Sequence, residues 1–347
     1  MEILDAKTLT LVSGAPVLLD KAPSTLKKFL KPEAYQSMIE LVTPVCQDLK
    51  EIEAFFLDKL SLLERLAERH GLLIFAASLH PFVEARDQIL FQDPRYKAIF
   101  RELQLVGRRF IAQGLHVHLG MPDQEAAIKL YNALLPYLPL FLALTTSSPF
   151  YEGENTGFHS YRTKLFEVLP LAGLPRSFSC WDEYEHLLRF LAHLEIIESV
   201  RDLWWDIRIQ PHLGTLEIRI CDTPTRFKDL LAVVALIKAL AIRLLEDKTP
   251  RLPREAILYG KWQASRHGLE GFIVEPFRGG RVPLKRLAMA MMDYAYPVAD
   301  DLGFTPYWEG LKDILNRGPG SYRMLALFEQ GANFAEIIET LRGEFWK

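Results

Sequence analysis

Apolar and polar residues follow two different periods along this chain. Between residues 45 and 70, leucine, isoleucine and phenylalanine recur every three or four positions, which predicts an amphipathic helix. The same spacing predicts further helices at residues 124–130, 182–197, 227–245 and from 283 to the end. Residues 72–77 instead form a short continuous apolar run after Gly71, which predicts a buried strand.

A second group of segments has the two-residue period of β-strands. Residues 203–210 and 214–221 flank the sequence Pro211-His212-Leu213 and predict a β-hairpin. Long helices mixed with neighbouring strands are typical of the α+β class with an antiparallel sheet. We find no repeat, low-complexity segment or Gly/Ser linker that would divide the chain. We therefore expect a single domain over residues 1–347, with a helical C-terminal part from about residue 283.

Alternation gathers polar side chains on one face of the predicted strands, because positions i and i+2 share a face. The strands and a fourth strand-like stretch around residue 40 carry the following polar residues: Glu40, His116, His118, Asp206, Arg208, Gln210, Thr215, Glu217 and Arg219. In any one of these strands alone, the polar residues could equally lie on the solvent-exposed face of an ordinary sheet. Together they predict a concave floor with carboxylates for a hard cation and guanidinium groups for phosphate.

Two other interpretations of these segments stay open from the residues alone. His116, His118 and Glu217 would supply two imidazoles and one carboxylate with an open position, which indicates a zinc-dependent hydrolase. Residues 147–162 combine hydroxyls, an amide, two acids and an arginine, and so predict a functional loop. A plain connection between two helices is the alternative for that loop.

Composition narrows the class of protein. Hydrophobic residues make up 49% and charged residues 24% of the chain, as in ordinary globular proteins. The net charge of −3 gives no general attraction to nucleic acid or to an anionic membrane, so an anionic ligand needs a local cluster of arginine, lysine or metal. Three widely spaced cysteines indicate a reducing compartment. The start of the chain lacks the pattern of a signal peptide, and Leu134–Leu144 is too short to span a bilayer. We expect a soluble cytoplasmic protein, monomeric or homo-oligomeric.

A series of motifs in a fixed order carries a family likeness. These motifs are Glu40–Thr43, His80–Phe82, Arg95–Tyr96, Gly114–His118, Ser148–Arg162, Trp204–Arg208, Gly214–Asp222 and Trp262–Leu269. Taken together they resemble the glutamate–cysteine ligase type 2 family, which consists of bacterial carboxylate–amine ligases. The likeness extends over nearly the whole chain.

The resemblance implies a fold, a reaction and a set of ligands. The fold would be glutamine-synthetase-like: a curved antiparallel sheet forming a cup, with helices packed outside. In this family ATP phosphorylates the carboxylate of an amino-acid substrate, and an amine then displaces phosphate to form an amide. Magnesium, or manganese in its place, neutralises the phosphates during such a transfer. The reaction needs no nucleophilic side chain, since the substrate carboxylate attacks.

The resemblance also implies roles for individual residues. The metal ligands would be Glu40, His116 and Glu217, with Glu33 as a weaker match. The catalytic arginines, which contact phosphate or substrate, would be Arg219 and Arg162. The remaining substrate and ATP contacts are expected at Arg208, Arg95, Tyr96, Thr156 and Arg266.

The first strand departs from the family pattern. The family usually opens with Gly-x-Glu-x-Glu, whose acids hold metals, and the matching register places that motif just before Met1. Residues 2–5 would then be the tail of this strand, and Glu2 would lie outside the acidic motif. We accordingly expect reduced catalysis by the chain as given, and a metal-site-deficient relative that binds without turnover is a second alternative to the ligase.

Overall fold

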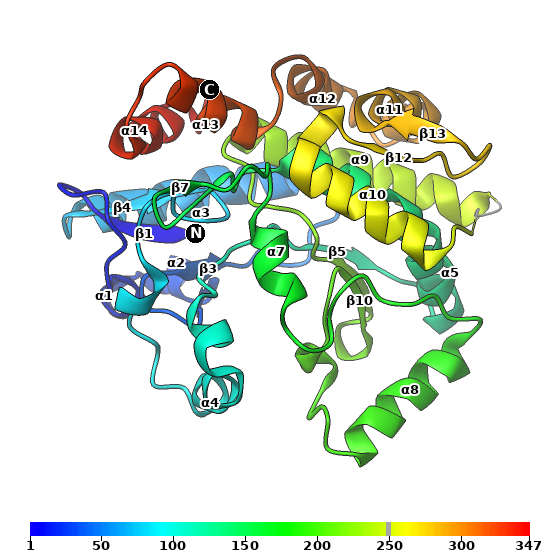
Figure 1. Ribbon diagram of the computed structural model, residues 1–347, viewed down its shortest axis with the longest axis horizontal. Coiled ribbons are helices and arrows are strands. Elements are labelled where there is room, and N and C mark those ends of the chain that lie inside the picture. The colour runs from blue at the N-terminus through cyan, green and yellow to red at the C-terminus, as the bar shows by residue number, and fades with distance from the viewer. Residues whose placement is uncertain (248–250) are drawn as a thin grey trace.

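Long helices pack around short strands (Figure 1). The computed structural model describes residues 1–247 and 251–347. The helices are α1 Ala15–Lys21, α2 Ser24–Lys27, α3 Leu49–Glu68, α4 Pro94–Arg108, α5 Gln124–Leu134, α6 Leu138–Thr145, α7 Arg162–Glu167, α8 Trp181–His193, α9 Phe227–Glu246, α10 Arg254–His267, α11 Leu284–Asp301, α12 Thr305–Arg317, α13 Gly320–Glu329 and α14 Phe334–Glu344. The helices α9 to α12 lie together on one side of the strands, whereas α4 and α8 project at the opposite side (Figure 1).

The strands are short and fall into several small sheets. They are β1 Glu2–Asp5, β2 Leu30–Pro32, β3 Ile39–Leu41, β4 Leu72–Phe75, β5 Val117–Gly120, β6 Phe150–Tyr151, β7 Glu154–Asn155, β8 Ala172–Gly173, β9 Trp204–Trp205, β10 Ile207–Gln210, β11 Thr215–Ile218, β12 Phe272–Val274 and β13 Arg281–Pro283. In the described residues, β10, β11 and β5 form a three-stranded antiparallel sheet, and the other strands pair in twos. The mixed helix-and-strand class is confirmed, and the single cup-shaped sheet stays a prediction.

Several predicted elements are confirmed with small shifts at their ends. The helix expected over 45–70 begins at Leu49, because the Asp48 side chain accepts a hydrogen bond from the Glu51 N–H at 2.9 Å and caps the helix. Asp123 caps α5 in the same way, through the Ala126 N–H at 2.7 Å. The predicted hairpin is β10 and β11, joined by a 3-10 turn over Pro211–Leu213 and by Gly214 at φ 62°. The C-terminal part is helical from Leu284 onward, as expected.

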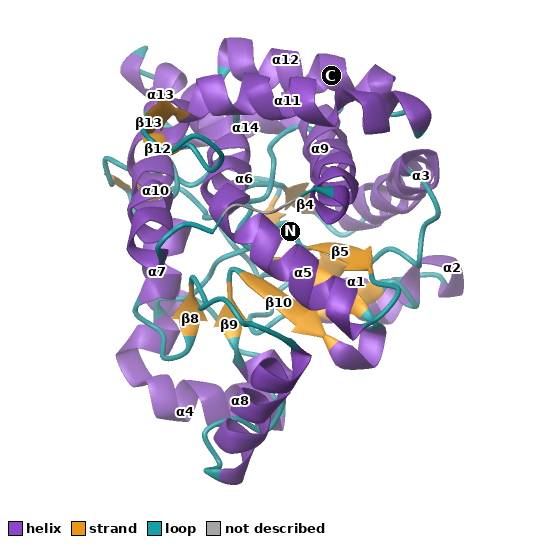
Figure 2. Ribbon diagram, turned by 90° about the vertical axis from the view of Figure 1, so that its right-hand side faces the viewer, coloured by secondary structure: helices purple, strands orange, loops and turns teal. Residues whose placement is uncertain are grey.

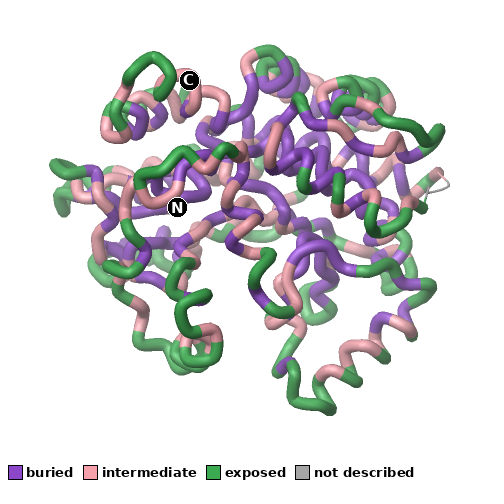
Figure 3. Tube along the Cα trace, viewed as in Figure 1, coloured by how far each residue is buried: buried purple, intermediate pink, exposed green. Residues whose placement is uncertain are grey.

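The main core lies between the helices and the apolar face of the three-stranded sheet. Helix α5 crosses β10 (Figure 2), and α9 packs against α5, α11 and α12. The strands supply the buried side chains of Val117, Leu119, Ile207, Ile209, Leu216 and Ile218. Each such side chain stabilises the fold by roughly 1.5–3 kcal/mol. Buried segments occupy the centre of the molecule, and exposed positions gather on its outer turns, including α4 and α8 (Figure 3).

One apolar segment has the length of a membrane span. Residues Gln124–Thr145 are long and apolar enough to cross a bilayer, but 89% of their most apolar window is buried inside the protein. They comprise α5, a turn with Pro136, and α6, whose eight residues are all buried. This burial is what a central core helix of a globular fold shows.

The C-terminal helices return to the N-terminal strands. Ile337, Ile338 and Leu341 of α14 share an apolar cluster with Leu4 of β1 and Phe75 of β4. The Arg342 side chain donates to the Ile74 carbonyl at 3.2 Å. Both ends of the chain therefore contribute to one packed region at the sheet of β1 and β4. The organisation of the chain as a single domain stays a prediction.

Candidate active site

The register of the three-stranded sheet places three polar residues in one row. Arg208 of β10 pairs with Glu217 of β11, and Glu217 pairs with His118 of β5. Residues directly opposite in antiparallel strands have their side chains on the same face and close together. The polar face predicted from alternation is therefore real for these three residues.

Glu217 is the centre of this polar face. Its Oε2 accepts hydrogen bonds from Arg208 Nε at 3.0 Å and Gln210 Nε2 at 2.7 Å. Its Oε1 pairs with Arg219 Nη1 at 2.5 Å. His116 Nδ1 and His118 Nε2 lie 3.6 and 3.7 Å from the same oxygen. The structure thus brings together four of the residues that the sequence assigned to metal or phosphate binding: Arg208, Arg219, His116 and Glu217.

These contacts fix the charge states at the centre of the site. Burial alone would raise the pKa of Glu217, but Arg219, His116 and Arg208 hold it well below its usual range. Burial, reinforced by Arg219, lowers the pKa of His116 well below its usual value. Near neutral pH the carboxylate is therefore ionised and the His116 imidazole is neutral.

A second acidic group lies on the hairpin formed by β2 and β3. Glu40 belongs to β3 and Glu33 directly follows β2, and both side chains are half-buried. Burial and the neighbouring charge of Glu40 raise the pKa of Glu33 to about 7. The pKa of Glu40 is raised as well, by burial first, with the Met1 ammonium and Arg219 opposing and Glu217 contributing. Among the described residues, Glu217 has ion pairs within 4 Å and these two carboxylates have none.

Tyr96 and Arg95 occupy the first turn of α4 but differ in their surroundings. Burial and the charges of Glu33 and Glu40 raise the pKa of Tyr96 to about 12, which places its phenol beside the hairpin carboxylates. Arg95 instead donates to Asp202 Oδ1 at 3.0 Å from an exposed position. Tyr96 is thus assembled with the site, whereas Arg95 ties α4 to the turn before β9.

The three predicted arginines of the sheet region differ in how free their donors are. Arg208 Nη1 donates to the carbonyls of Val200, Arg201 and Leu203, and the side chain is 5% exposed. Arg162 is equally buried and donates to backbone carbonyls behind the sheet. The Arg219 side chain is 14% exposed and pairs with Glu217, and its charge opposes the rise in pKa of Glu33 and Glu40. Arg219 is the one of these three best placed to meet an anionic ligand.

The predicted functional loop is held in place by its own contacts. Its strands β6 and β7 pair across a tight turn. Thr156 Oγ1 donates to the Pro149 carbonyl at 2.7 Å, and Arg266 of α10 binds the Gly157 carbonyl and packs over the Phe158 ring. The hydroxyl of Thr156 therefore orders the loop, and direct contact of Thr156 or Arg266 with a ligand stays a prediction.

Sequence reasoning placed one residue wrongly and missed another. Asp206 was expected on the polar face beside Arg208, but it lies between β9 and β10, where Lys261 Nζ binds its Oδ2 at 2.7 Å. Lys261 is 1% exposed, and no local pattern in α10 distinguishes it from a surface lysine. A pair separated by 55 residues cannot be derived from periodicity.

The donor set decides which metal the site suits. In residues 1–247 and 251–347, no group of three or more His, Cys, Asp or Glu side chains is arranged to hold a metal ion. Both oxygens of Glu217 already contact arginine, which disfavours the zinc site of two histidines and one carboxylate. Magnesium in nucleotide sites is held by one or two carboxylates together with phosphate and water. The hairpin carboxylates, which lack a cationic partner within ion-pair distance in the described chain, fit that requirement.

Comparison with known sequences identifies relatives over nearly the whole chain. The sequence profile of glutamate–cysteine ligase family 2 matches residues 12–338. A protein of Roseiflexus castenholzii that carries the name glutamate–cysteine ligase 2 is 35% identical over 345 residues, covering 98% of this chain and 91% of its own length. A protein of Gloeobacter violaceus with the same name is 36% identical over 349 residues, covering 98% of this chain and 94% of its own length.

Comparison with solved structures shows a shared fold at low sequence identity. The glutamate–cysteine ligase of Francisella tularensis, solved in complex with AMP, matches 99% of this chain and 87% of its own with a TM-score of 0.69 at 12% identity. A bifunctional glutathione synthetase of Pasteurella multocida matches 99% of this chain with a TM-score of 0.72 at 15% identity. This chain spans 51% of that longer protein.

Proposed function

Because this chain belongs to glutamate–cysteine ligase family 2, we propose that it is an ATP-dependent carboxylate–amine ligase acting on small amino-acid substrates, with glutamate as acid and cysteine as amine. The observation that carries the proposal is the arrangement of charge on the polar face. Arg219 pairs with an ionised Glu217, and its charge also acts on the hairpin carboxylates Glu33 and Glu40. Such an arrangement supplies a cation site beside a guanidinium, which is what phosphoryl transfer between two anions requires.

The reaction has two steps. The substrate carboxylate attacks the γ-phosphorus of ATP, giving an acyl phosphate and ADP. The free amine of the second substrate then attacks the acyl carbon, and phosphate leaves as the amide forms, with one proton released from the amine. The Arg219 guanidinium offers planar, paired donors for the oxygens of the transferring phosphoryl group.

Magnesium, or manganese in its place, would be held chiefly by Glu40 and Glu33, where it would neutralise the phosphates of ATP. Glu217 and His116, the other predicted ligands, border this space, and Glu217 mainly orients Arg208 and Arg219. Tyr96 of α4 adds a phenol whose pKa is raised by burial and by the charges of Glu33 and Glu40. By binding Arg208 and Arg219, Glu217 keeps their positive charge on the polar face before any ligand binds.

We extend the proposal to the architecture. The bridge from Glu2 to Met38 links β1 to the hairpin of β2 and β3, and β1 pairs with β4. These strands and the three-stranded sheet would act as one cup-shaped floor within a single cytoplasmic ligase domain. A homo-oligomer is compatible with this arrangement, and neither nucleic acid nor membrane takes part.

The test is amide formation by the purified chain with ATP, magnesium, glutamate and cysteine. We expect ADP, phosphate and the dipeptide in equal amounts by mass spectrometry, and no dipeptide when any component is omitted. At limiting magnesium, Glu40→Gln should lower the amount of product, whereas Glu185→Gln, which changes a surface ion pair on α8, should leave it unchanged. Product formation without ATP, or equal activity of both variants, would remove the proposal.

A further inference from the structure

The backbone of Arg219 and Ile220 is held from two sides. The strand β11 ends at Ile218, so the sheet ladder does not fix these two residues. The N–H groups of Arg219 and Ile220 both donate to the Asp206 carbonyl, at 2.8 and 3.1 Å. Their carbonyls accept from the Arg162 guanidinium, from Nη2 and Nη1 respectively, each at 3.2 Å. Four hydrogen bonds thus clamp the segment from which the Arg219 side chain projects.

Each partner in this clamp is fixed by a buried opposite charge. The Asp206 carboxylate binds Lys261 Nζ at 3.0 and 2.7 Å. Arg162 Nη1 lies 3.7 Å from Asp222 Oδ1, and Asp222 is fully buried. Charges removed from water in this way persist only where paired and hydrogen-bonded. Both pairs therefore act as fixed points behind the polar face.

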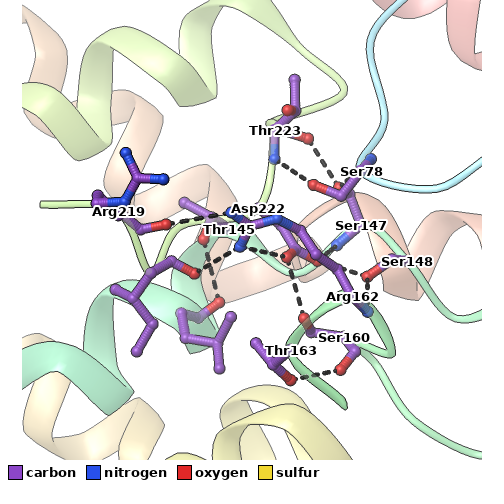
Figure 4. A network of polar contacts seen from close by, with 12 residues as sticks. Ser78, Thr145, Ser147, Ser148, Ser160, Arg162, Thr163, Arg219, Asp222 and Thr223 are labelled. Atoms are coloured by element: carbon purple, nitrogen blue, oxygen red, sulfur yellow. Dashed lines mark hydrogen bonds and ion pairs between the residues drawn. The ribbon is translucent and has the colours of Figure 1, made fainter. Parts of the chain in front are cut away.

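Asp222 also connects the clamp to the loop over residues 147–162. Its Oδ2 accepts from the Ser147 N–H at 2.9 Å and from Ser148 Oγ at 2.8 Å, and its Oδ1 accepts from Ser160 Oγ at 3.0 Å. Figure 4 shows these contacts converging on Asp222, with the Arg219 guanidinium pointing away from them and its backbone carbonyl turned toward them. Asp222 thus acts on the Arg219 backbone and has no contact with the Arg219 side chain.

The position of Arg162 has little freedom. A Cβ added at Gly114 would lie 2.3 Å from Arg162 Nη2 and 3.0 Å from the Cys221 carbonyl. The guanidinium therefore fills the space above Gly114. With two donors on backbone carbonyls and a carboxylate beside it, Arg162 supports the neighbouring backbone from behind the polar face.

We infer that Asp222 is a positioning residue for the ligase reaction: through Arg162 it sets the place of Arg219 against Glu217. This inference rests on the proposed function, in which Arg219 meets the transferring phosphoryl group. An error of about 1 Å in the place of a reacting group costs on the order of a hundredfold in rate. Loosening the clamp should therefore lower kcat more than it raises the KM for ATP.

The kinetic test uses Asp222→Asn with a second substitution at Arg219. Asparagine can keep its bonds to Ser147 and Ser148 through its oxygen and turn its amide toward Ser160, so the change removes mainly the charge that faces Arg162. We expect kcat to fall by about tenfold or more, with the KM for ATP changed by less than about threefold. In an Arg219→Lys background the same change should cost less than about threefold, because a residue that acts through Arg219 loses its target. Equal losses in both backgrounds, or an unchanged kcat, would overturn the inference.

A second readout does not depend on catalysis. In Asp222→Asn, amide hydrogen exchange at Arg219 and Ile220 should accelerate by about tenfold or more, while Leu216 within β11 stays unchanged. Ser148→Ala removes one bond to Asp222 and should show the same pattern more weakly, which covers the case in which Asp222→Asn does not fold. A wild-type chain that forms no amide would contradict the proposed function, whereas unchanged exchange at Arg219 and Ile220 would overturn the positioning role alone.

Discussion

Glu217 lies on the three-stranded sheet and the pair of Glu33 and Glu40 on the hairpin of β2 and β3, and their surroundings shift their pKa values in opposite directions. Burial raises the pKa of a carboxyl group in both places. At Glu217, Arg219, His116 and Arg208 overcome that effect. On the hairpin, the charges of the Met1 ammonium and of Arg219 oppose burial without overcoming it, and Glu40 adds repulsion to Glu33.

This difference separates two kinds of acidic residue within the site. A carboxylate already paired with two arginines holds them in a fixed geometry, and its removal destabilises the folded state because it leaves their buried charge uncompensated. A buried pair without a counter-ion costs stability and is satisfied when a cation arrives. The comparison therefore predicts opposite effects of the same Glu-to-Gln change at the two places.

The largest effect is expected at Glu217. Glu217→Gln leaves Arg208 and Arg219 without their carboxylate, and we expect a loss of about 3 kcal/mol in the free energy of unfolding, at the low end for a broken buried pair because Arg208 keeps its backbone partners. Ligase activity should disappear even at temperatures where the variant remains folded by circular dichroism. Denaturant unfolding compared with Glu185→Gln on the surface measures the stability effect. Full stability in Glu217→Gln would show that the arginines do not depend on this carboxylate.

The second effect, expected in Glu40→Gln, is a weaker dependence of stability than of activity: magnesium binding is impaired while the fold is not destabilised. Glu40→Gln removes one buried charge that has no ion-pair partner in the described chain, so the free energy of unfolding should stay equal or rise by about 1 kcal/mol. The magnesium concentration for half-maximal activity should rise by about tenfold or more, because one of the few protein ligands is lost. A magnesium titration of wild type and variant measures this. If neither Glu40→Gln nor Glu33→Gln changed the magnesium concentration for half-maximal activity, the hairpin would not be part of the metal site.

The third effect distinguishes Arg219 from Arg208. Arg219→Lys keeps the charge but loses the planar fork, and we expect a drop in kcat of about tenfold with little change in the free energy of unfolding. Arg208→Lys should instead destabilise the fold, since lysine cannot bind Glu217 and three carbonyls at once. Steady-state kinetics and denaturant unfolding of both variants decide this. A raised KM with an unchanged kcat in Arg219→Lys would contradict this role, because it would show that Arg219 binds the substrate and the transition state equally well.

The smallest effect concerns the buried His80, where desolvation acts almost alone. Burial lowers the pKa of His80 to about 4, and its Nε2 donates to the Leu9 carbonyl. The folded-state pKa lies below the unfolded value of about 6.5, so the unfolded chain binds the extra proton between these values. The stability contributed by neutral His80 is thus complete above about pH 6.5 and declines as the pH falls toward 4. We expect a loss of about 1 kcal/mol between pH 7.5 and 5.5 that His80→Gln, whose side-chain amide can still donate to the Leu9 carbonyl, does not show.

The sequence predicts well what depends on neighbouring residues. The hairpin of β10 and β11, the helices α3 and α5, and the C-terminal helices follow from periodicity and helix-start chemistry within a few residues. Alternation also places Glu217 and His118 on one face, and the sheet register then brings them opposite each other. The family resemblance added the reaction, which periodicity alone cannot provide.

What the sequence could not supply are contacts between distant segments. The neighbouring sequence does not show that Lys261 pairs with Asp206. Nor does it show that the Arg162 guanidinium donates to the carbonyls of Arg219 and Ile220. An arginine beside an active-site strand has the same signature whether it binds substrate or backbone. The difference lies in burial and partner geometry, which arise only when the chain is folded.

The central claim is that the acid substrate is activated by transfer of the terminal phosphoryl group of ATP. Glutamate labelled with heavy oxygen in its carboxylates tests this directly, with phosphorus NMR as the readout on the released phosphate. If the carboxylate attacks the γ-phosphorus, one labelled oxygen passes into each phosphate as the amide forms. Phosphate without label, or release of AMP and pyrophosphate, would contradict the account.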